Sequence, residues 1–354
     1  MIDTSTIRIE PTTNSRINGL DEDNIPFGKL YSDHMFIADY ENGEWKDQRI
    51  VPFQNISVSP ANTTLHYAIT IFEGLKAYRD ENGKVVVFRP QANAKRLNIS
   101  AERMCIPEVP EGLFMDALTE LLRLDSSWVP SKPGTALYIR PFVFGTDEYI
   151  GIRPSESFRF MIITGPVGSY YTKPVNVKIE TEFSRAFEGG TGFAKAGGNY
   201  AASLYPARLA REKGFDQLIW TDGKTHKYIE ESGTMNVMFV IDNIIRTAPT
   251  SGTILKGITR DSVLTIAKDW GLEVQEAPIA VEDVISAAKE GRLTEAFGVG
   301  TAATIAPIAK IGYQEDIYEL PEGNENSFSQ KILKELNNIR TGKTEDKYGW
   351  NYKI

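Results

Sequence analysis

The chain has 354 residues, of which 41% are hydrophobic and 24% are charged. This composition excludes a collagen-like, disulfide-rich or intrinsically disordered chain, and the length predicts about two domains. The 39 lysines and arginines are outnumbered by 47 aspartates and glutamates, which gives a net charge of −8. Because no long basic run occurs, we expect no nucleic-acid partner and no attachment to a membrane.

Cysteine and histidine are too sparse for a disulfide framework or a metal site. Cys105 is the only cysteine, and we expect it to be a small buried hydrophobe. The histidines, His34, His66 and His226, have neither HxxxH nor HExxH spacing, so no metal site is predicted. Residues 1–20 contain acidic side chains and no apolar run, which suits neither a secretory signal nor a transit peptide. A cytoplasmic protein is therefore expected.

The first half of the chain reads as a strand-rich α+β unit. Two pairs of strands are predicted where an Asn-Gly turn supplies the positive φ angles of a tight hairpin, at Asn42-Gly43 and Asn82-Gly83. Helical spacing and apolar runs predict the remaining elements. The expected strands lie in residues 33–53, 74–89, 135–145 and 158–168, and the expected helices in 91–104 and 112–125.

The second half follows a segment that mixes glycine, serine, proline and aromatic residues and reads as an ordered linker. We place an N-terminal domain at residues 1–168, the linker at 169–180 and a C-terminal domain at 181–354. Strands are expected at 175–183, 216–222 and 234–242, and helices at 201–214, 257–271, 280–291 and 326–340.

Lys195 stands in a glycine-dense loop, residues 188–200, beside Phe193 and Ala194. A lone lysine is usually a solvated surface charge. Glycines, however, let the backbone approach a ligand closely, and burial disfavours the charged form of an amine. Because a neutral amine can attack an aldehyde, Lys195 is a candidate for Schiff-base chemistry.

Two further segments could bind an anion. Residues 255–261 open a helix with Gly257 and Thr259, and helix N-termini favour phosphate, although a plain Thr N-cap is the simpler interpretation. Residues 297–303 match G-x-G-x-x-A. The dinucleotide-binding alternative needs a long helix after this motif, which Pro307 interrupts, so a short turn presenting the Thr301 hydroxyl remains.

An acid and an arginine complete a recognisable set of groups. Glu231 precedes an apolar strand and is either a solubilising edge residue or a carboxylate directed into a site, and Arg96 is a surface charge or an ion-pair partner. An amine for the aldehyde, an acid for the pyridine nitrogen, and a cation with N–H donors for the phosphate are what pyridoxal phosphate (PLP) requires.

At this point four segments, FAKAGGNYAASL, EESGTMNVMF, LKGITRDS and FGVGTAA, resemble the branched-chain amino acid aminotransferases of PLP fold type IV. The resemblance continues in the first half through FEGLKAYR, FRPQANAKRLNIS and LYIRPFVFGT and covers nearly the whole chain in order. It implies an α/β (α+β) fold of two domains with the cofactor in the interdomain cleft. It also implies a homodimer in which a loop of the partner helps to close the site.

The same resemblance implies roles for individual residues. Lys195 would be the catalytic lysine that binds PLP and moves the substrate proton, and Glu231 would pair with the pyridine nitrogen. The other cofactor-binding positions would be Arg96, Tyr200, Ile258, Thr259 and Thr301. Arg140 would help to bind the glutamate side chain. The other substrate-binding positions would be Phe27, Tyr67, Phe72, Tyr138, Ile152, Tyr170, Thr234 and Ala302.

The implied activity is reversible, ping-pong transfer of the amino group of leucine, isoleucine or valine to 2-oxoglutarate. Among alternatives, a D-amino acid aminotransferase or aminodeoxychorismate lyase is disfavoured by chain length and by the YIRP and GGNYAAS segments. An NAD-linked oxidoreductase is disfavoured by Pro307. A non-catalytic binding protein is disfavoured because the lysine, the acid and the arginine are all present.

Overall fold

The computed structural model describes residues 7–168, 170–171 and 173–354. These residues form two compact units. Unit 1 comprises Met1–Tyr170, Ala194–Gly198 and Asn338–Ile354, and unit 2 comprises Tyr171–Phe193 and Asn199–Asn337. The short segment around Lys195 and the end of the chain therefore group with the N-terminal residues, unlike the expected spans 1–168 and 181–354.

The expected linker, residues 169–180, includes a five-residue strand of a sheet. Residues 169 and 172 lie outside the described part of the chain. Val175–Ile179 is strand β9, and it pairs in parallel with strands on both of its sides. The reason is its alternation of buried Val175, Val177 and Ile179, which is the period of a strand and supplies apolar side chains to the core of unit 2.

Unit 1 is built on one sheet, which contains nine strands among the described residues, in the order β1-β3-β2-β8-β7-β5-β6-β19, with β4 paired to β7. The strands are β1 (Arg8–Ile9), β2 (His34–Glu41), β3 (Glu44–Pro52), β4 (Thr70–Phe72), β5 (Leu75–Arg79), β6 (Val85–Phe88), β7 (Ala136–Gly145), β8 (Phe158–Val167) and β19 (Asn351–Lys353). Both predicted hairpins are confirmed, as β2–β3 and β5–β6. Asn42 and Gly43 take φ angles of 55° and 87° in the first turn, as a tight hairpin requires.

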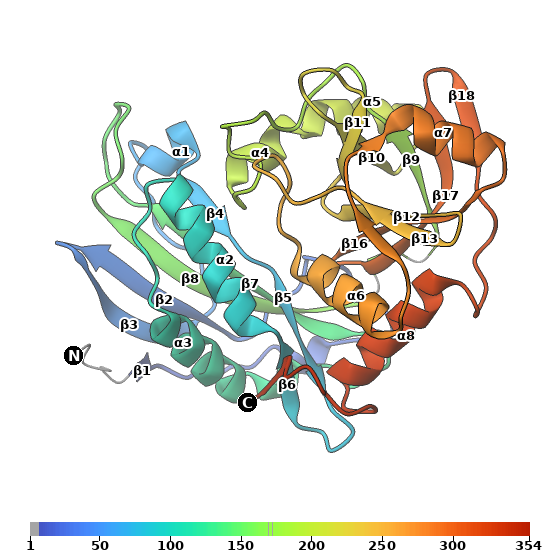
Figure 1. Cartoon of the computed structure of the whole chain (residues 1–354). Helices are drawn as coiled ribbons and strands as arrows, with labels where there is room; N and C mark the ends of the chain where they lie inside the picture. The colour runs from blue at the N-terminus through green and yellow to red at the C-terminus, as the bar shows by residue number, and fades with distance from the viewer. Residues whose placement is uncertain (1–6, 169, 172) are drawn as a thin grey trace. The chain divides into compact units, whose positions relative to one another are not determined.

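Helices cover one face of this sheet (Figure 1). They are α2 (Pro90–Arg103) and α3 (Glu111–Leu124), and a short α1 (Thr63–Tyr67) precedes β4. The predicted apolar face of α3 is confirmed, since Ala117, Leu118 and Leu121 are buried against the same core as the β7 residue Leu137. The expectation for Cys105 was wrong. It is exposed, because it lies in the turn after α2 with a φ of 53°.

Unit 2 has a second, mixed sheet, in the order β14-β13-β12-β16-β17-β9-β10-β11-β15, with β18 paired to β17. Besides β9, its strands are β10 (Gln217–Thr221), β11 (Tyr228–Ser232), β12 (Asn236–Ile241), β13 (Ile244–Thr247), β14 (Val274–Glu276), β15 (Ile279–Ala280), β16 (Leu293–Gly300), β17 (Thr304–Tyr313) and β18 (Asp316–Glu319). The remaining helices are α4 (Gly197–Ala202), α5 (Leu204–Glu212), α6 (Ile258–Asp269), α7 (Val281–Lys289) and α8 (Phe328–Arg340). The single helix expected over 201–214 is thus two helices, and α4 and α8 each have residues in both units.

The turn after β16 settles how the G-x-G-x-x-A motif folds. Gly300 pairs with Thr304, and β17 runs back antiparallel to β16. The motif therefore closes a hairpin, and no helix begins there, as the sequence analysis predicted. Over the residues that the structure describes, no helix combines the length and apolarity needed to span a bilayer.

Candidate active site

The backbone of Lys195 is fixed on both sides within unit 1. Its carbonyl accepts a hydrogen bond from the Phe72 N–H at 3.0 Å, and its own N–H donates to the Ser100 hydroxyl at 2.9 Å. Ser100 belongs to α2 and Phe72 to β4, so the loop is held between a helix and a strand. A Cβ at Gly197 would come 2.8 Å from the Thr70 methyl, so glycine is needed for this close approach.

An aromatic wall formed by Phe72, Tyr138, Phe27 and Tyr170 begins beside the Lys195 side chain. The Lys195 ammonium nitrogen lies 4.8 Å from the centre of the Phe72 ring, and the Arg140 guanidinium carbon lies 4.6 Å from the same centre. Arg140 also donates to the Tyr138 hydroxyl at 2.9 Å. Phe27 packs edge-on against Tyr138, with ring centres 5.4 Å apart. These residues, all predicted from the sequence, are thereby brought together.

Arg96 is only 7% exposed, so of its two predicted environments the ion pair is correct. Its Nε and Nη2 donate to the two carboxylate oxygens of Glu73 at 2.7 and 2.8 Å, and Asn93 donates to Glu73 at 2.7 Å. Burial alone would raise the pKa of Glu73. The charge and hydrogen bonds of Arg96 outweigh it, with help from Lys195 and Asn93, and the pKa of Glu73 lies below its ordinary value.

Sequence reasoning missed Glu73. An acid inside the apolar segment Thr70–Leu75 was the available signal, because a carboxylate that strand pairing buries needs a cationic partner. The bidentate pairing fixes the plane of the Arg96 guanidinium. Glu73 therefore orients the arginine.

Glu231, in unit 2, is 5% exposed within β11, so the solubilising-edge interpretation was wrong. One carboxylate oxygen pairs with Arg185 at 2.8 Å, and the other accepts from the Asn236 amide at 3.3 Å and the Leu255 N–H at 3.2 Å. Arg185 also donates to the carbonyls of Gly192 and Thr253. Arg185 and Asn236 were not identified from the sequence. Both orient the acid, Arg185 from a distant segment of the chain and Asn236 from the start of the next strand.

The start of α6 lies beside the same acid. Gly257 is its N-cap and forms no side-chain capping bond, so the interpretation of Thr259 as a plain N-cap was wrong. A Cβ at Gly257 would collide with the Asn236 amide oxygen, which explains why glycine is found there. Ile258 and Thr259 form the first turn of this helix, whose backbone N–H groups carry the positive end of the helix dipole.

Thr234 lies near the turn that holds Thr301 and Ala302. Asn236 pairs with Val299 across β12 and β16. A Cβ at Gly300 would lie 3.5 Å from the Thr234 carbonyl oxygen. Thr301 and Ala302 in the turn, and Thr234 beside it, are therefore close together within unit 2. Tyr200 is partly buried in α4.

One predicted substrate position, Ile152, is 94% exposed in the loop between β7 and β8 and is not part of the aromatic wall. Tyr67, at the end of α1, is 37% exposed, like Tyr170. A residue that the sequence analysis did not name lies closer to the wall. Lys76 pairs with Tyr138 across β5 and β7, and burial, followed by the nearby charge of Arg340, lowers the pKa of Lys76 to about 7.

Comparison with known proteins identifies the family to which the chain belongs. The family model for amino-transferase class IV matches residues 70–311. "Branched-chain-amino-acid aminotransferase 2" of Bacillus subtilis is 44% identical over 99% of this chain and 97% of its own length. The chain belongs to the class IV aminotransferases. "Branched-chain-amino-acid transaminase 1" of the same organism is 42% identical over 94% of this chain and 95% of its own length.

Solved structures of other class IV aminotransferases agree in fold. The branched-chain aminotransferase of Thermoproteus uzoniensis, solved with norvaline, superposes with a TM-score of 0.74 at 27% identity and covers 90% of this chain and 99% of its own. The branched-chain amino acid aminotransferase of T.th., complexed with N-(5'-phosphopyridoxyl)-L-glutamate, gives 0.74 at 26% identity over 92% of this chain and 99% of its own. The α/β fold type IV architecture is confirmed.

Class IV aminotransferases use PLP, and the side chains present fit this cofactor. Unit 1 offers the Lys195 amine and the Arg96 guanidinium. Unit 2 offers the Glu231 carboxylate and the backbone N–H groups at the start of α6, whose N-cap forms no side-chain capping bond. An amine, a cation, an acid and helix N–H groups are the donors and acceptors that an aldehyde, a phosphate and a pyridine nitrogen need.

Proposed function

We propose that this protein is a PLP-dependent branched-chain amino acid transaminase. It transfers the amino group of leucine, isoleucine or valine to 2-oxoglutarate and catalyses the reverse reaction, in two half-reactions that share one cofactor. The family assignment and the two Bacillus subtilis relatives at 44% and 42% identity support this function. The resulting role is in branched-chain amino acid synthesis and degradation.

One observation carries the substrate assignment, namely an arginine set among aromatic rings. Arg140 lies over Phe72 and donates to Tyr138, and Phe27 and Tyr170 extend the apolar surface. Aromatic rings suit a branched aliphatic side chain, whereas a guanidinium suits the second carboxylate of glutamate. One wall can therefore accept both kinds of amino donor.

PLP supplies the electron sink that allows the Cα–H bond of an amino acid to break. We propose that Lys195 takes this proton from Cα of the amino acid and delivers it to the cofactor. The contacts with Phe72 and Ser100 fix the backbone that carries the Lys195 amine. Glu231, which is oriented by Arg185, would hold a proton at the pyridine nitrogen. The phosphate group would be held by Arg96, Ile258, Thr259 and Thr301, and Tyr200 would contribute to binding the cofactor.

We propose that the amino acid is bound by the remaining predicted positions. The turn at Thr301 and Ala302, with Thr234 beside it, would bind the α-carboxylate through N–H donors. Phe27, Tyr67, Phe72, Tyr138 and Tyr170 would contact the side chain.

The assembly and location are part of the same proposal. We infer a cytoplasmic homodimer that acts on small molecules, without a nucleic-acid or membrane partner. Ile150 and Ile152 are 69% and 94% exposed, and such apolar side chains at a loop tip suit coverage by another subunit. Ile152 would then contribute to the substrate pocket of the partner.

A panel of amino donors tests the proposed reaction. With 2-oxoglutarate as acceptor, leucine, isoleucine and valine should give kcat/KM values at least about tenfold above those of alanine and aspartate, because only the branched side chains fill an apolar pocket. Glutamate formation measures the rate. Equal rates for aspartate and leucine would reject the assignment to branched-chain substrates.

Arg140→Ala separates the two substrate classes. Removing a charged hydrogen-bond donor to the side-chain carboxylate should raise the KM for glutamate about tenfold or more, since such bonds contribute about 1.5–3 kcal/mol. The KM for leucine should change by less than about threefold. Steady-state kinetics with each donor provide the measurement, and Arg123→Ala on the exposed face of α3 is the control. Equal losses for glutamate and leucine would contradict this role of Arg140.

A further inference from the structure

The chain that leads into β2 forms a strap over unit 1, which we define as residues 10–31. The strap lies directly against β8, since a Cβ at Gly165 would collide with the Leu30 carbonyl oxygen. Near its end the strap carries Phe27, whose ring packs edge-on against both Tyr138 and Tyr170. The position of the strap therefore decides where Phe27 lies on the aromatic wall.

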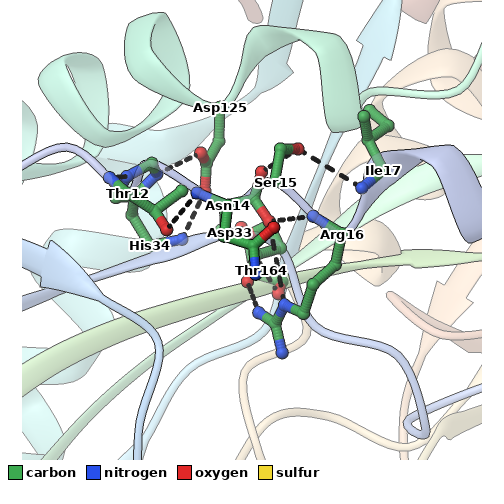
Figure 2. Close-up of polar contacts among 10 residues, drawn as sticks. Thr12, Asn14, Ser15, Arg16, Ile17, Asp33, His34, Asp125 and Thr164 are labelled. Carbon is green, nitrogen blue, oxygen red and sulfur yellow. Dashed lines mark hydrogen bonds and ion pairs between the residues drawn. The ribbon is translucent and has the colours of Figure 1, made fainter.

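Asp33 fastens the middle of the strap to the start of β2 (Figure 2). One oxygen of its carboxylate accepts from the Ser15 hydroxyl at 2.5 Å, and the other accepts from the Arg16 N–H at 2.9 Å. The Arg16 guanidinium donates to the Ser32 carbonyl at 2.5 Å. Burial alone would raise the pKa of Asp33, but the hydrogen bonds from Arg16 and Ser15 outweigh it and lower the pKa. Asp33 thus stays charged at neutral pH.

His34 makes the second attachment, and its hydrogen bonds define its tautomer. The Thr12 N–H donates to Nε2 of His34 at 2.8 Å, and Nδ1 lies 2.6 Å from the Asp125 carboxylate. The other Asp125 oxygen accepts from the His34 backbone N–H at 3.0 Å. Because Nε2 accepts, the ring is neutral and its proton is on Nδ1, where Asp125 accepts it.

We propose that His34 and Asp125 are positioning residues that, through the neutral Nδ1–H tautomer of His34, hold the strap and thereby set Phe27 against the substrate. The His34 side chain is 6% exposed and that of Asp125 is 2% exposed, so neither is an incidental surface contact. The part of this inference that concerns substrate rests on the proposed function. The attachment of Thr12 to His34 and of His34 to Asp125, which we call the latch, lies within unit 1 and does not depend on that function.

The same geometry makes the latch sensitive to protonation. A proton added at Nε2 would place an N–H donor opposite the Thr12 N–H donor, and the hydrogen bond that holds the strap would be lost. The charged side chains described around the latch are Asp125 after α3, Asp33 at the start of β2, and Arg16 on the strap. β3 presents Pro52 opposite His34. Asp125 keeps its own bond to the ring in both states, so a proton at Nε2 would remove only the attachment at Thr12.

Nuclear magnetic resonance reads the tautomer directly. The chain has three histidines, so the full-length protein labelled with [15N]histidine gives three ring systems, and His34→Gln identifies the one from His34. At pH 8 we expect the Nδ1–H tautomer. At the same pH the backbone amide of Thr12 should exchange slowly, after correction for its intrinsic rate, because it donates to Nε2. An Nε2–H tautomer, or an unprotected Thr12 amide, would overturn the latch.

Two variants separate the halves of the latch. In His34→Gln the amide oxygen can take the place of Nε2 as acceptor for Thr12, so protection should persist. His34→Asn can still donate to Asp125 but is too short to reach Thr12. Its residues 10–20 should exchange about tenfold faster at every pH, the equivalent of one lost hydrogen bond. Equal exchange in the two variants would contradict the inference.

Kinetics then connect the latch to the substrate. His34→Asn should raise the KM for leucine several-fold and leave kcat within about twofold, because Phe27 contributes to binding and not to bond breaking. A lower kcat at unchanged KM would overturn the positioning role. If the exchange results agree with the expectation but the enzyme does not turn over leucine, the proposed function is rejected and the inference about the attachment of the strap still stands.

Discussion

Lys195→Ala is expected to abolish transamination, with kcat reduced by at least about a thousandfold. The loss is large because one side chain supplies both the amine that binds the aldehyde and the base that moves the proton. No neighbouring amine stands ready to replace it on the same loop, in which Lys195 is the one lysine between residues 188 and 200. Glutamate formation from leucine and 2-oxoglutarate measures the effect.

The matched control is Lys95→Ala, which removes an exposed lysine from α2 and should leave kcat unchanged. Borohydride reduction of the PLP-loaded protein, followed by peptide mass mapping, should place the pyridoxyl group on Lys195. A Lys195→Ala enzyme with full turnover, or a label on another lysine, would refute the assignment.

Glu73→Ala is expected to lower the free energy of unfolding by about 3–5 kcal/mol, because it leaves the Arg96 guanidinium buried without its partner. Glu73 is fully buried, and Arg96 is 7% exposed. Denaturant unfolding measures the change. Arg123→Ala removes an exposed ion pair with Glu120 and, as the control, should cost less than about 1 kcal/mol.

The pH dependence of the free energy of unfolding gives a second measure of the Glu73–Arg96 ion pair. Since the folded-state pKa of Glu73 is lowered, its charge stabilises the folded state above the pKa of the unfolded chain, and this contribution is lost as the pH falls through the folded-state value. Glu73→Gln, which keeps the shape but not the charge, should therefore be less stable than the parent at pH 7, and the difference should shrink in acid. An unchanged difference at every pH would contradict the role of charge.

Local sequence rules predicted most of the secondary structure. The Asn-Gly pairs placed two hairpins because Gly43 and Gly83 take positive φ in the turns. The apolar spacing of residues 113–121 placed the buried face of α3. The failures lie where tertiary contacts compete with local preference. Cys105 is exposed because of the turn it occupies, and Gly257, not Thr259, caps α6 because Asn236 lies against it.

The candidate site divides in the same way. The sequence predicted roles for Lys195, Arg96 and Glu231 through the family resemblance, and the chemistry of that family needs an amine, a cation and an acid. Which side chains hold these groups in position was decided by contacts between distant segments. Arg185 lies 46 residues before Glu231 in the chain, yet the two pair at 2.8 Å.

By itself, the sequence determined the family and the turns and predicted the reactive groups, since each of these depends on a short run of residues. The tertiary structure alone decided the partners of the buried charges: Glu73 for Arg96, Arg185 for Glu231, and Asp125 for His34. The physical reason is that a charge removed from water needs an opposite charge or a hydrogen bond nearby, and only the folded chain determines which residue is near enough to supply it.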